Sequence, residues 1–243
     1  MGMTIIGGMT ITGGMSLASP PPVLNYSVAY DGSGDAITFG ANSANLAIGD
    51  QDFTWEAFIY FNSVPSTEID IFESQTTNTL RILKRGSSSG LSVDFYGGTS
   101  YLIKSDATIT TGVWHHVAVT RSSGSLFTYF DGLRTSGPFF VPTTGATPTV
   151  AYGVGGRATG ANSLNGYISN MRLTTGSLGQ EAVLYSGATY TVPTSQLTTN
   201  VGPYGAVVNL LICQSSTLKD NSANNYTITA VGNAAVNSLN PFS

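Results

Sequence analysis

The sequence predicts an all-β protein, a two-sheet antiparallel jelly-roll sandwich with a short N-terminal β segment ahead of it. Short runs that alternate apolar and polar residues, such as FTWEAFIYF at 53–61, recur along the chain. Turn pairs such as Asp31-Gly32 separate these runs at short intervals. No stretch shows sustained helical periodicity, so a short turn at 180–185 is the one helix we expect. About a dozen short strands of this kind are typical of two packed sheets.

The chain divides into two parts at three consecutive prolines, and we assign residues 1–22 and 23–243 to them. The first part repeats MTIIGG and MTITGG before MSL. Because the repeat length is even, a strand keeps its facing, and one side carries Met3, Ile5, Met9, Ile11, Met15 and Leu17. A segment this short cannot bury the apolar row by itself. We therefore expect it to be an attachment segment that binds sibling chains or another protein. A flexible leader is the alternative.

The composition excludes several classes of partner. Charged residues make up 9% of the chain and hydrophobic residues 41%, whereas roughly a quarter of an average protein is charged. Residues 1–80 contain acids but no Lys or Arg, and the later basic residues form no stripe that could neutralise phosphates. We therefore expect no nucleic-acid binding. No apolar run reaches the length of a membrane span, and we expect cytoplasmic synthesis without a secretory signal.

One hairpin carries a family resemblance. The run WHHVAVTRSSGSLFTYFDG at 114–132 alternates in facing and turns at Ser123-Gly124. It resembles the signature hairpin of laminin-G-like domains, which have the concanavalin A-like jelly roll. The stretches LNYSVAYDGSGDAITFG, FTWEAFIYF and GYISNMRLTTGSLGQEAVLY are similar to further strands of that family. The resemblance covers about residues 24–235. It implies the fold, together with glycan, protein or calcium binding, or a purely architectural role.

The C-terminal region carries a second resemblance. The runs VLYSGATYTVPTSQLTT and NLLICQSSTLKDNSANNYTITAVGNAAVNSLNPF resemble segments of marine bacteriophage virion proteins, especially those of cyanophages. In many relatives the DNSANNYTI-type stretch opens a domain, whereas here it closes the chain. This difference suggests a permuted closure, in which the segment completes its own sheet or pairs with a neighbouring copy.

The second resemblance implies a virion protein, made in the host cytoplasm and assembled on the particle surface. As a tail fibre or decoration protein, it would display a carbohydrate-binding-type domain for host adhesion. Its partners would be other virion proteins through residues 1–22, sibling chains with a trimer favoured, and a host surface glycan. A purely structural decoration protein without a glycan ligand is an alternative function.

The run EIDIFE at 68–73 carries three carboxylates. It resembles the Glu-x-Asp-x-x-Glu strand of laminarinase- and agarase-like retaining hydrolases. In that resemblance Glu68 is the nucleophile, Asp70 its modulator and Glu73 the acid/base. Residues five apart face opposite sides of a regular strand, so Glu73 joins the other two only if a β-bulge lies near Ile71-Phe72.

The surroundings of this run argue against catalysis. Hydrolases of that type line the cleft with several tryptophans, whereas this chain has only Trp55 and Trp114, at positions that fit strand packing. The hairpin at 114–132 also has the laminin-G form. We therefore expect no enzymatic activity and a solvated acidic strand face at 68–73, with a polysaccharide hydrolase and an oxygen-ligand cation site as the alternatives.

Other polar residues give weaker signals. We expect no cofactor, although loop oxygens of Asp31, Asp35, Asp50 and Asp52 are weak calcium candidates; turn formation is the favoured interpretation. His115 and His116 are adjacent, so they should face opposite sides of a strand, one packed and one exposed. The single Cys213 lies among apolar neighbours and should be a buried thiol. The sequence assigns no ligand-binding residue.

Overall fold

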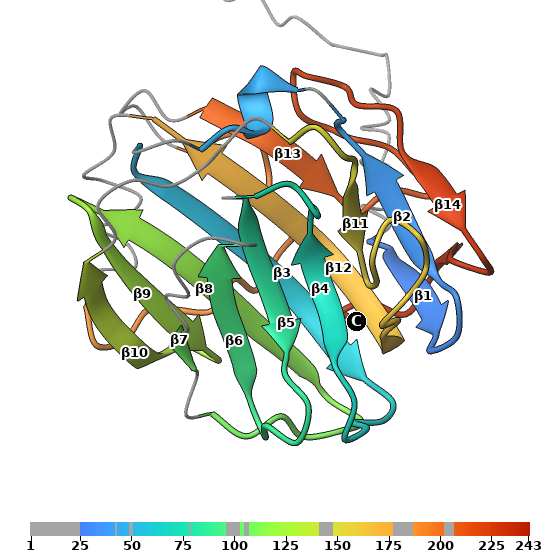
Figure 1. The fold of residues 1–243 in the computed structure, drawn as a ribbon, viewed down its shortest axis with the longest axis horizontal. Helices are drawn as coiled ribbons and strands as arrows, with labels where there is room; N and C mark the ends of the chain where they lie inside the picture. The colour runs from blue at the N-terminus through green and yellow to red at the C-terminus, as the bar shows by residue number, and fades with distance from the viewer. Residues whose placement is uncertain are drawn as a thin grey trace, which may run out of the picture.

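The computed structural model of the protein describes residues 25–41, 43–48, 51–77, 79–95, 103–104, 107–140, 148–176, 187–201 and 207–243. These residues form two antiparallel sheets (Figure 1), which confirms the all-β sandwich. The expected attachment segment at 1–22 and the expected helix at 180–185 lie outside the described residues. Within them the only helical element is the 3-10 turn η1 (Ala44–Leu46). No helix among the described residues is long and apolar enough to cross a bilayer.

The larger sheet, called sheet A, is centred on two long strands. In spatial order its path is β10 (Leu133–Phe140), β9 (Ser125–Phe130), β8 (Trp114–Ser122), β3 (Phe53–Phe61), β12 (Asn165–Thr175), β1 (Ser27–Asp31) and β15 (Ala235–Asn237). The eighth strand, β13 (Val207–Ile212), pairs with the C-terminal half of β12, while β1 pairs with its N-terminal half. The hairpin at 114–132 is therefore β8 and β9, as the sequence predicts.

The second sheet, called sheet B, has seven strands. Their order is β14 (Thr229–Val231), β2 (Ala36–Phe39), β11 (Tyr152–Val154), β4 (Ile69–Glu73), β5 (Leu80–Lys84), β6 (Leu91–Phe95) and β7 (Ile103–Lys104). The acidic run at 68–73 thus supplies an inner strand, with β11 on one side and β5 on the other.

Aromatic side chains join the two sheets in the core. Trp55 of sheet A is fully buried, and its ring lies 5.9 Å from that of Phe72 in sheet B. Phe72 stacks on Tyr152 at 4.4 Å, and Phe39 stacks on the same tyrosine at 5.8 Å. Cys213 is 6% exposed, which confirms the buried thiol. The alternating residues of the predicted strands therefore meet across one core, which holds the loops at the sandwich ends in place.

The C-terminal segment completes the chain's own sheets. Strand β14 pairs with β2 in sheet B, and β15 pairs with β1 in sheet A. Between them and β13, the buried carboxylate of Asp220 accepts hydrogen bonds from the backbone N–H groups of Leu211 at 3.0 Å, Ser222 at 2.9 Å and Tyr226 at 3.0 Å. Of the two alternatives for a permuted closure, the structure shows the intramolecular one.

Candidate functional site

Three connections between the sheets meet at one end of the sandwich. Residues 32–35 lead from β1 to β2, residues 62–68 from β3 to β4, and residues 155–164 from β11 to β12. Each passes from one sheet to the other at the lower right of Figure 1. Loops held at the end of a rigid sandwich are a common place for binding sites.

Close backbone contacts hold two of these connections together. Gly160 has φ +82°, and a Cβ at this position would lie 2.2 Å from the carbonyl oxygen of Gly34. Only glycine fits both the conformation and the approach. Ser163 Oγ accepts a hydrogen bond from the N–H of Asp35 at 2.8 Å and lies 2.9 Å from the carbonyl oxygen of that residue. These contacts fix the 155–164 connection against the β1–β2 turn.

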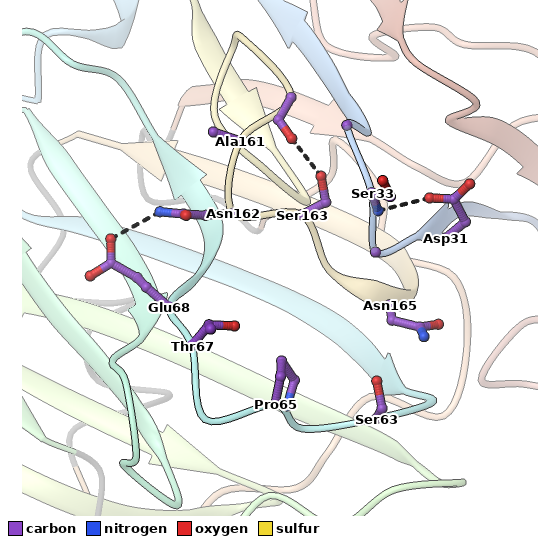
Figure 2. Close-up of a pocket in the computed structure, with 13 residues that line it drawn as sticks. Asp31, Ser33, Ser63, Pro65, Thr67, Glu68, Ala161, Asn162, Ser163 and Asn165 are labelled. Atoms are coloured by element: carbon purple, nitrogen blue, oxygen red, sulfur yellow. Dashed lines mark hydrogen bonds between the residues drawn. The ribbon is translucent and has the colours of Figure 1, made fainter.

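The three connections enclose a polar pocket of about 550 Å³. Figure 2 shows Asp31 at one side and Glu68 at the other, with Asn162 and Ser163 between them. The polar side chains that line it are those of Asp31, Ser33, Ser63, Thr67, Glu68, Asn162, Ser163 and Asn165. We call this the rim pocket. Its volume is suited to a small ligand rich in hydrogen-bonding groups.

A bulge in β4 brings the three carboxylates of EIDIFE together. The pairing of β4 with β5 shifts register between Asp70 and Phe72, so Ile71 is the extra residue. Asp70 and Glu73 consequently lie on the same side of the strand, where both contact Arg81 of β5. The β-bulge near Ile71-Phe72, which the sequence requires for Glu73 to join Glu68 and Asp70, is therefore present.

Two arginines bind all three carboxylates. Arg81 Nη2 lies 2.6 Å from Glu68 Oε1 and 2.7 Å from Asp70 Oδ1, and its Nε contacts Glu73. Arg157 approaches from the 155–164 connection, with Nη2 3.1 Å from Glu68 Oε1 and Nε 3.0 Å from Asp70 Oδ2 and 3.3 Å from Glu73 Oε1. We call these five side chains the rim charge cluster. It ties a wall of the rim pocket to sheet B.

The prediction of a solvated acidic face is wrong. The side chains of Asp70 and Glu73 are 0% exposed, and only Glu68, at 27%, reaches solvent. The 155–164 connection covers this side of β4, because Asn162 Nδ2 also donates to Asp70 at 2.8 Å and to Glu68 at 3.1 Å. Glu68 and Asn162 both line the rim pocket, so the buried charge cluster opens into it through these two residues.

Burial and charge set the protonation of the cluster. Burial, followed by the charge of Asp70, raises the pKa of Glu73 to about 7, although both arginines oppose the shift. With three ionised carboxylates and two arginines, the formal charge of the cluster is −1. A proton on Glu73 neutralises it. Burial opposes the charge of Arg81, but the carboxylates, Asp70 first, outweigh it and raise the pKa of Arg81, so its charge is permanent.

The described aspartates among the calcium candidates accept backbone hydrogen bonds, which for Asp31 and Asp35 are local contacts of the β1–β2 turn. Asp31 Oδ1 accepts from the N–H of Ser33 at 2.8 Å, and the fully buried Asp35 accepts from the N–H of Asp31 at 2.7 Å. Asp52 accepts from the N–H of Ser123 at 2.8 Å, and Asp50 lies outside the described residues. Among the residues that the structure describes, no group of three or more His, Cys, Asp or Glu side chains is placed to hold a metal ion.

The two histidines are both buried, so the expectation of one exposed ring is wrong. His115 is 4% exposed, and its Nδ1 lies 2.7 Å from Asp131 Oδ2. His116 is 1% exposed and contacts Glu56 and Tyr190. Tyr190 belongs to the segment 187–201, which therefore covers His116, whereas His115 packs on the Phe130 ring at 4.6 Å.

The sequence did not reveal the partners of the acidic run. Arg81 is the first basic residue in the chain, and it stands in the strand that follows the run. That order is a usable signal for a cross-strand ion pair. Arg157 and Asn162 are distant in sequence and reach the cluster only through the packing of the 155–164 connection.

Comparison with known proteins assigns the family. A sequence model described as the concanavalin A-like lectin/glucanases superfamily, of the laminin G type, matches residues 31–184. The chain belongs to this superfamily. The match confirms the laminin-G-like resemblance. No curated protein matches the sequence significantly.

Solved structures with some similarity to this chain include one that shares its fold, the first of the three that follow. A putative carbohydrate-binding protein from Bacteroides ovatus is 20% identical with a TM-score of 0.58; the alignment covers 91% of this chain and 62% of that one. Mouse laminin α1 domains LG4-5 are 15% identical with a TM-score of 0.46, covering 61% of this chain and 40% of theirs. Domain 4 of a Geobacillus stearothermophilus arabinanase, solved with arabinotriose, is 17% identical with a TM-score of 0.43, covering 57% and 67%. This chain thus spans about three fifths of the Bacteroides protein.

Proposed function

We propose that this protein is a non-enzymatic glycan-binding domain and that the rim pocket holds a sugar unit. The observation that carries the proposal is the pocket lining, in which hydroxyl, amide and carboxylate groups converge from three connections. Sugar hydroxyls both donate and accept hydrogen bonds, so a mixed polar lining of this kind is complementary to them. The membership of a lectin/glucanase superfamily and the fold shared with a putative carbohydrate-binding protein support the same function.

Contacts within the protein hold the pocket walls in place before a ligand binds, which supports a binding role. Glu68 is held by Arg81, Arg157 and Asn162 at 2.6–3.1 Å, so its position does not depend on a ligand. The opposite wall is held by the hydrogen bonds of Asp35 and Ser163. A preformed pocket loses little conformational entropy when a ligand binds.

The same contacts oppose a hydrolytic role. A retaining hydrolase needs a free carboxylate nucleophile and a protonated acid beside the scissile bond. Here both arginines contact Glu68, and the side chain of Glu73 is 0% exposed, which removes it from the pocket surface. These contacts make the five side chains a structural support for the pocket.

Polysaccharide hydrolysis is nevertheless a second candidate, because two observations favour it. The bulge at Ile71 gathers Glu68, Asp70 and Glu73, and the pKa of Glu73, raised to about 7, is that of a general acid. The test is the release of reducing ends from a panel of β-glucans and galactans. Release that disappears in Glu68→Gln would replace the binding function with the enzymatic one.

We further propose that the domain is displayed on a phage virion, as a tail fibre or surface decoration protein that attaches through residues 1–22. The support is the sequence of the C-terminal region and the apolar repeat at 3–17. The comparisons do not indicate a phage origin. Assembly into a trimer on the particle belongs to the same proposal. Deleting residues 1–19 should abolish incorporation into particles, and unchanged incorporation would contradict attachment through this segment. Light scattering of the full chain should give the mass of a trimer, and the mass of a monomer would contradict the trimer.

The binding function is tested with a glycan array and titration calorimetry on the full chain. We expect a hit whose affinity falls about tenfold or more in Asn162→Ala, because Asn162 lines the pocket and a central polar contact is lost. The matched control is Asn45→Ala, an exposed asparagine of η1 that does not line the pocket. No hit on a broad array, or equal affinity in both variants, would overturn the pocket assignment.

A further inference from the structure

Three aromatic residues stand side by side on sheet A. Tyr60 of β3 pairs in register with Trp114 of β8 on one side and with Tyr167 of β12 on the other. All three are partly exposed, in contrast to the fully buried Trp55. We call these residues the aromatic row. It lies on the side of sheet A that faces away from sheet B, since Ile59 and Ile168, their neighbours in the strands, point into the core.

The rings form one cluster, in which Tyr60 meets each of the other two edge-to-face. The ring centroid of Tyr60 lies 5.5 Å from that of Trp114 and 5.6 Å from that of Tyr167. The centroids of the two outer rings are 6.4 Å apart, whereas strands separated by one intervening strand are about 9.5 Å apart. Trp114 and Tyr167 therefore lean toward each other over β3.

Neighbouring aromatics on the same side of the sheet are covered. Phe58 is two residues before Tyr60 on β3 and packs edge-on against Phe242, with ring centroids 5.1 Å apart. His116, two residues after Trp114, contacts Tyr190 of the 187–201 segment. The C-terminal residues and that segment thus cover the middle of the sheet and leave the aromatic row partly open at its end.

The aromatic row adjoins the rim pocket. Asn62 and Asn165 are each two residues from a ring of the row, along β3 and β12, and so share its side of the sheet. Asn62 Nδ2 donates to Asn165 Oδ1 at 3.0 Å, and Asn165 lines the rim pocket. Two residues along a strand span about 6.6 Å. Rings, amide pair and pocket therefore follow one another along the same end of the sheet.

We propose that the aromatic row is a stacking platform that extends the rim pocket, so that the protein binds a linear, neutral oligosaccharide and not an isolated sugar. One terminal unit occupies the pocket, the next lies over the amides of Asn62 and Asn165, and further units stack on Trp114 and Tyr167. The apolar face of a pyranose ring packs on an aromatic ring, while its hydroxyl groups remain available to amides and water. This inference rests on the proposed glycan binding and adds the length and direction of the ligand.

The test measures affinity against chain length in the full chain. Calorimetric titrations use linear β-1,3-glucan, β-1,4-glucan and β-1,4-mannan fragments of one to six units, so that the series that binds is identified. We expect the affinity to rise roughly tenfold to thirtyfold between one and four units, which is the usual effect of an aromatic anchor. In Tyr167→Ala this rise should disappear while binding of the single sugar is retained. Tyr167→Phe, which keeps the ring, should retain the rise.

A second measurement needs no substitution. Trp55 is fully buried and Trp114 is partly exposed, so acrylamide should quench mainly Trp114. A tetrasaccharide of the series that binds should protect this fluorescence, and the single sugar should not. Protection that instead depends on protein concentration, without sugar, would show that a second copy covers the row and would overturn the inference.

The outcomes separate the two proposals. The aromatic platform is overturned if the rise of affinity with chain length persists in Tyr167→Ala. It is also overturned if the unaltered chain binds the single sugar but shows no such rise. Either result leaves the rim pocket as the site. Binding of neither single sugars nor oligosaccharides overturns both. A rise that is lost in Tyr167→Ala, kept in Tyr167→Phe and accompanied by protection of Trp114 supports the platform.

Discussion

Each sheet contains a buried acidic group bound by arginine, and the two arrangements differ in charge balance. In sheet A, Glu56 meets one arginine, with Arg172 Nε at 2.9 Å and Nη2 at 2.5 Å from its Oε1, and His116 lies 3.2 Å from its other oxygen. In sheet B, the rim charge cluster sets three carboxylates against Arg81 and Arg157. The first arrangement is balanced, and the second has one carboxylate in excess.

The balance decides the protonation of each carboxylate. Burial alone would raise the pKa of Glu56, but the hydrogen bond with His116 and the charge of Arg172 lower it to about 2. At Glu73 burial and the neighbouring Asp70 prevail, and the pKa is raised to about 7. The difference teaches that a buried carboxylate with its own arginine keeps a low pKa, whereas in a cluster with one carboxylate in excess the pKa of one buried acid, Glu73, rises toward neutral pH.

Breaking the balanced pair should have the largest effect. Arg172→Met leaves the Glu56 carboxylate buried without its main counter-charge, and the loss of one partner of a buried ion pair costs about 3–5 kcal/mol. Urea unfolding followed by far-UV circular dichroism measures this loss. The control is Arg134→Met, an exposed arginine over the Phe127 ring, for which we expect a loss below about 1 kcal/mol. Equal losses in the two variants would show that the Glu56 pair is not a structural centre.

Glu73 should make stability depend on pH. Because its pKa in the folded state is raised to about 7 from the ordinary value of 4.5, the folded protein holds a proton that the unfolded chain releases. The resulting stabilisation is complete below about pH 4.5 and is lost as the pH rises through 7. Glu73→Gln imitates the protonated form, so the free energy of unfolding of the variant minus that of the unaltered chain should increase between pH 4.5 and 8.

The measurement compares the free energy of unfolding of Glu73→Gln with that of the unaltered chain at each pH, because other groups also titrate. The hydrogen bond and charge of Asp131 outweigh burial and raise the pKa of His115, so this residue also loses stabilisation as pH rises, and it is present in both proteins. The groups that face Glu73 are Asp70, Arg81 and Arg157, and they are unchanged in the variant. A difference that stays constant across this pH range would contradict the assignment of the proton to Glu73.

The smallest effect on stability should come from Glu68. Its side chain is 27% exposed, so Glu68→Gln should cost less than about 1 kcal/mol, as is usual for a solvent-screened ion pair. Sugar binding should nevertheless weaken, because the residue lines the rim pocket. Thermal unfolding and titration of the same preparation measure both. A loss of stability as large as that of Arg172→Met, with unchanged binding, would make Glu68 a structural residue.

The sequence predicted the strands better than their surroundings. Alternation in 53–61 and 114–132 located β3, β8 and β9, because strand facing is a local property. The bulge at 71 could be stated only as a condition, since a register shift depends on the partner strand. The burial of Asp70 and of His116 was missed, because distant segments, 155–164 and 187–201, cover them.

The candidate site was predictable only in part. Glu68 was identified from its spacing to two other acids, whereas Asn162, Ser163 and Asn165 gave no signal of their own. They reach the pocket because β12 begins beside the end of β3 and the preceding connection packs against the turn after β1. Spacing along the chain does not report such proximity.

By itself the sequence determined the fold class, the order of most strands and the polar, weakly charged character of the surface, because alternation, turn residues and composition act locally or as averages. The tertiary structure alone decided that the acids at 68–73 are bound by Arg81 and Arg157, that three connections surround the rim pocket and that Trp114, Tyr60 and Tyr167 form one cluster. These features depend on which strands become neighbours, and that choice follows from the burial of one shared core.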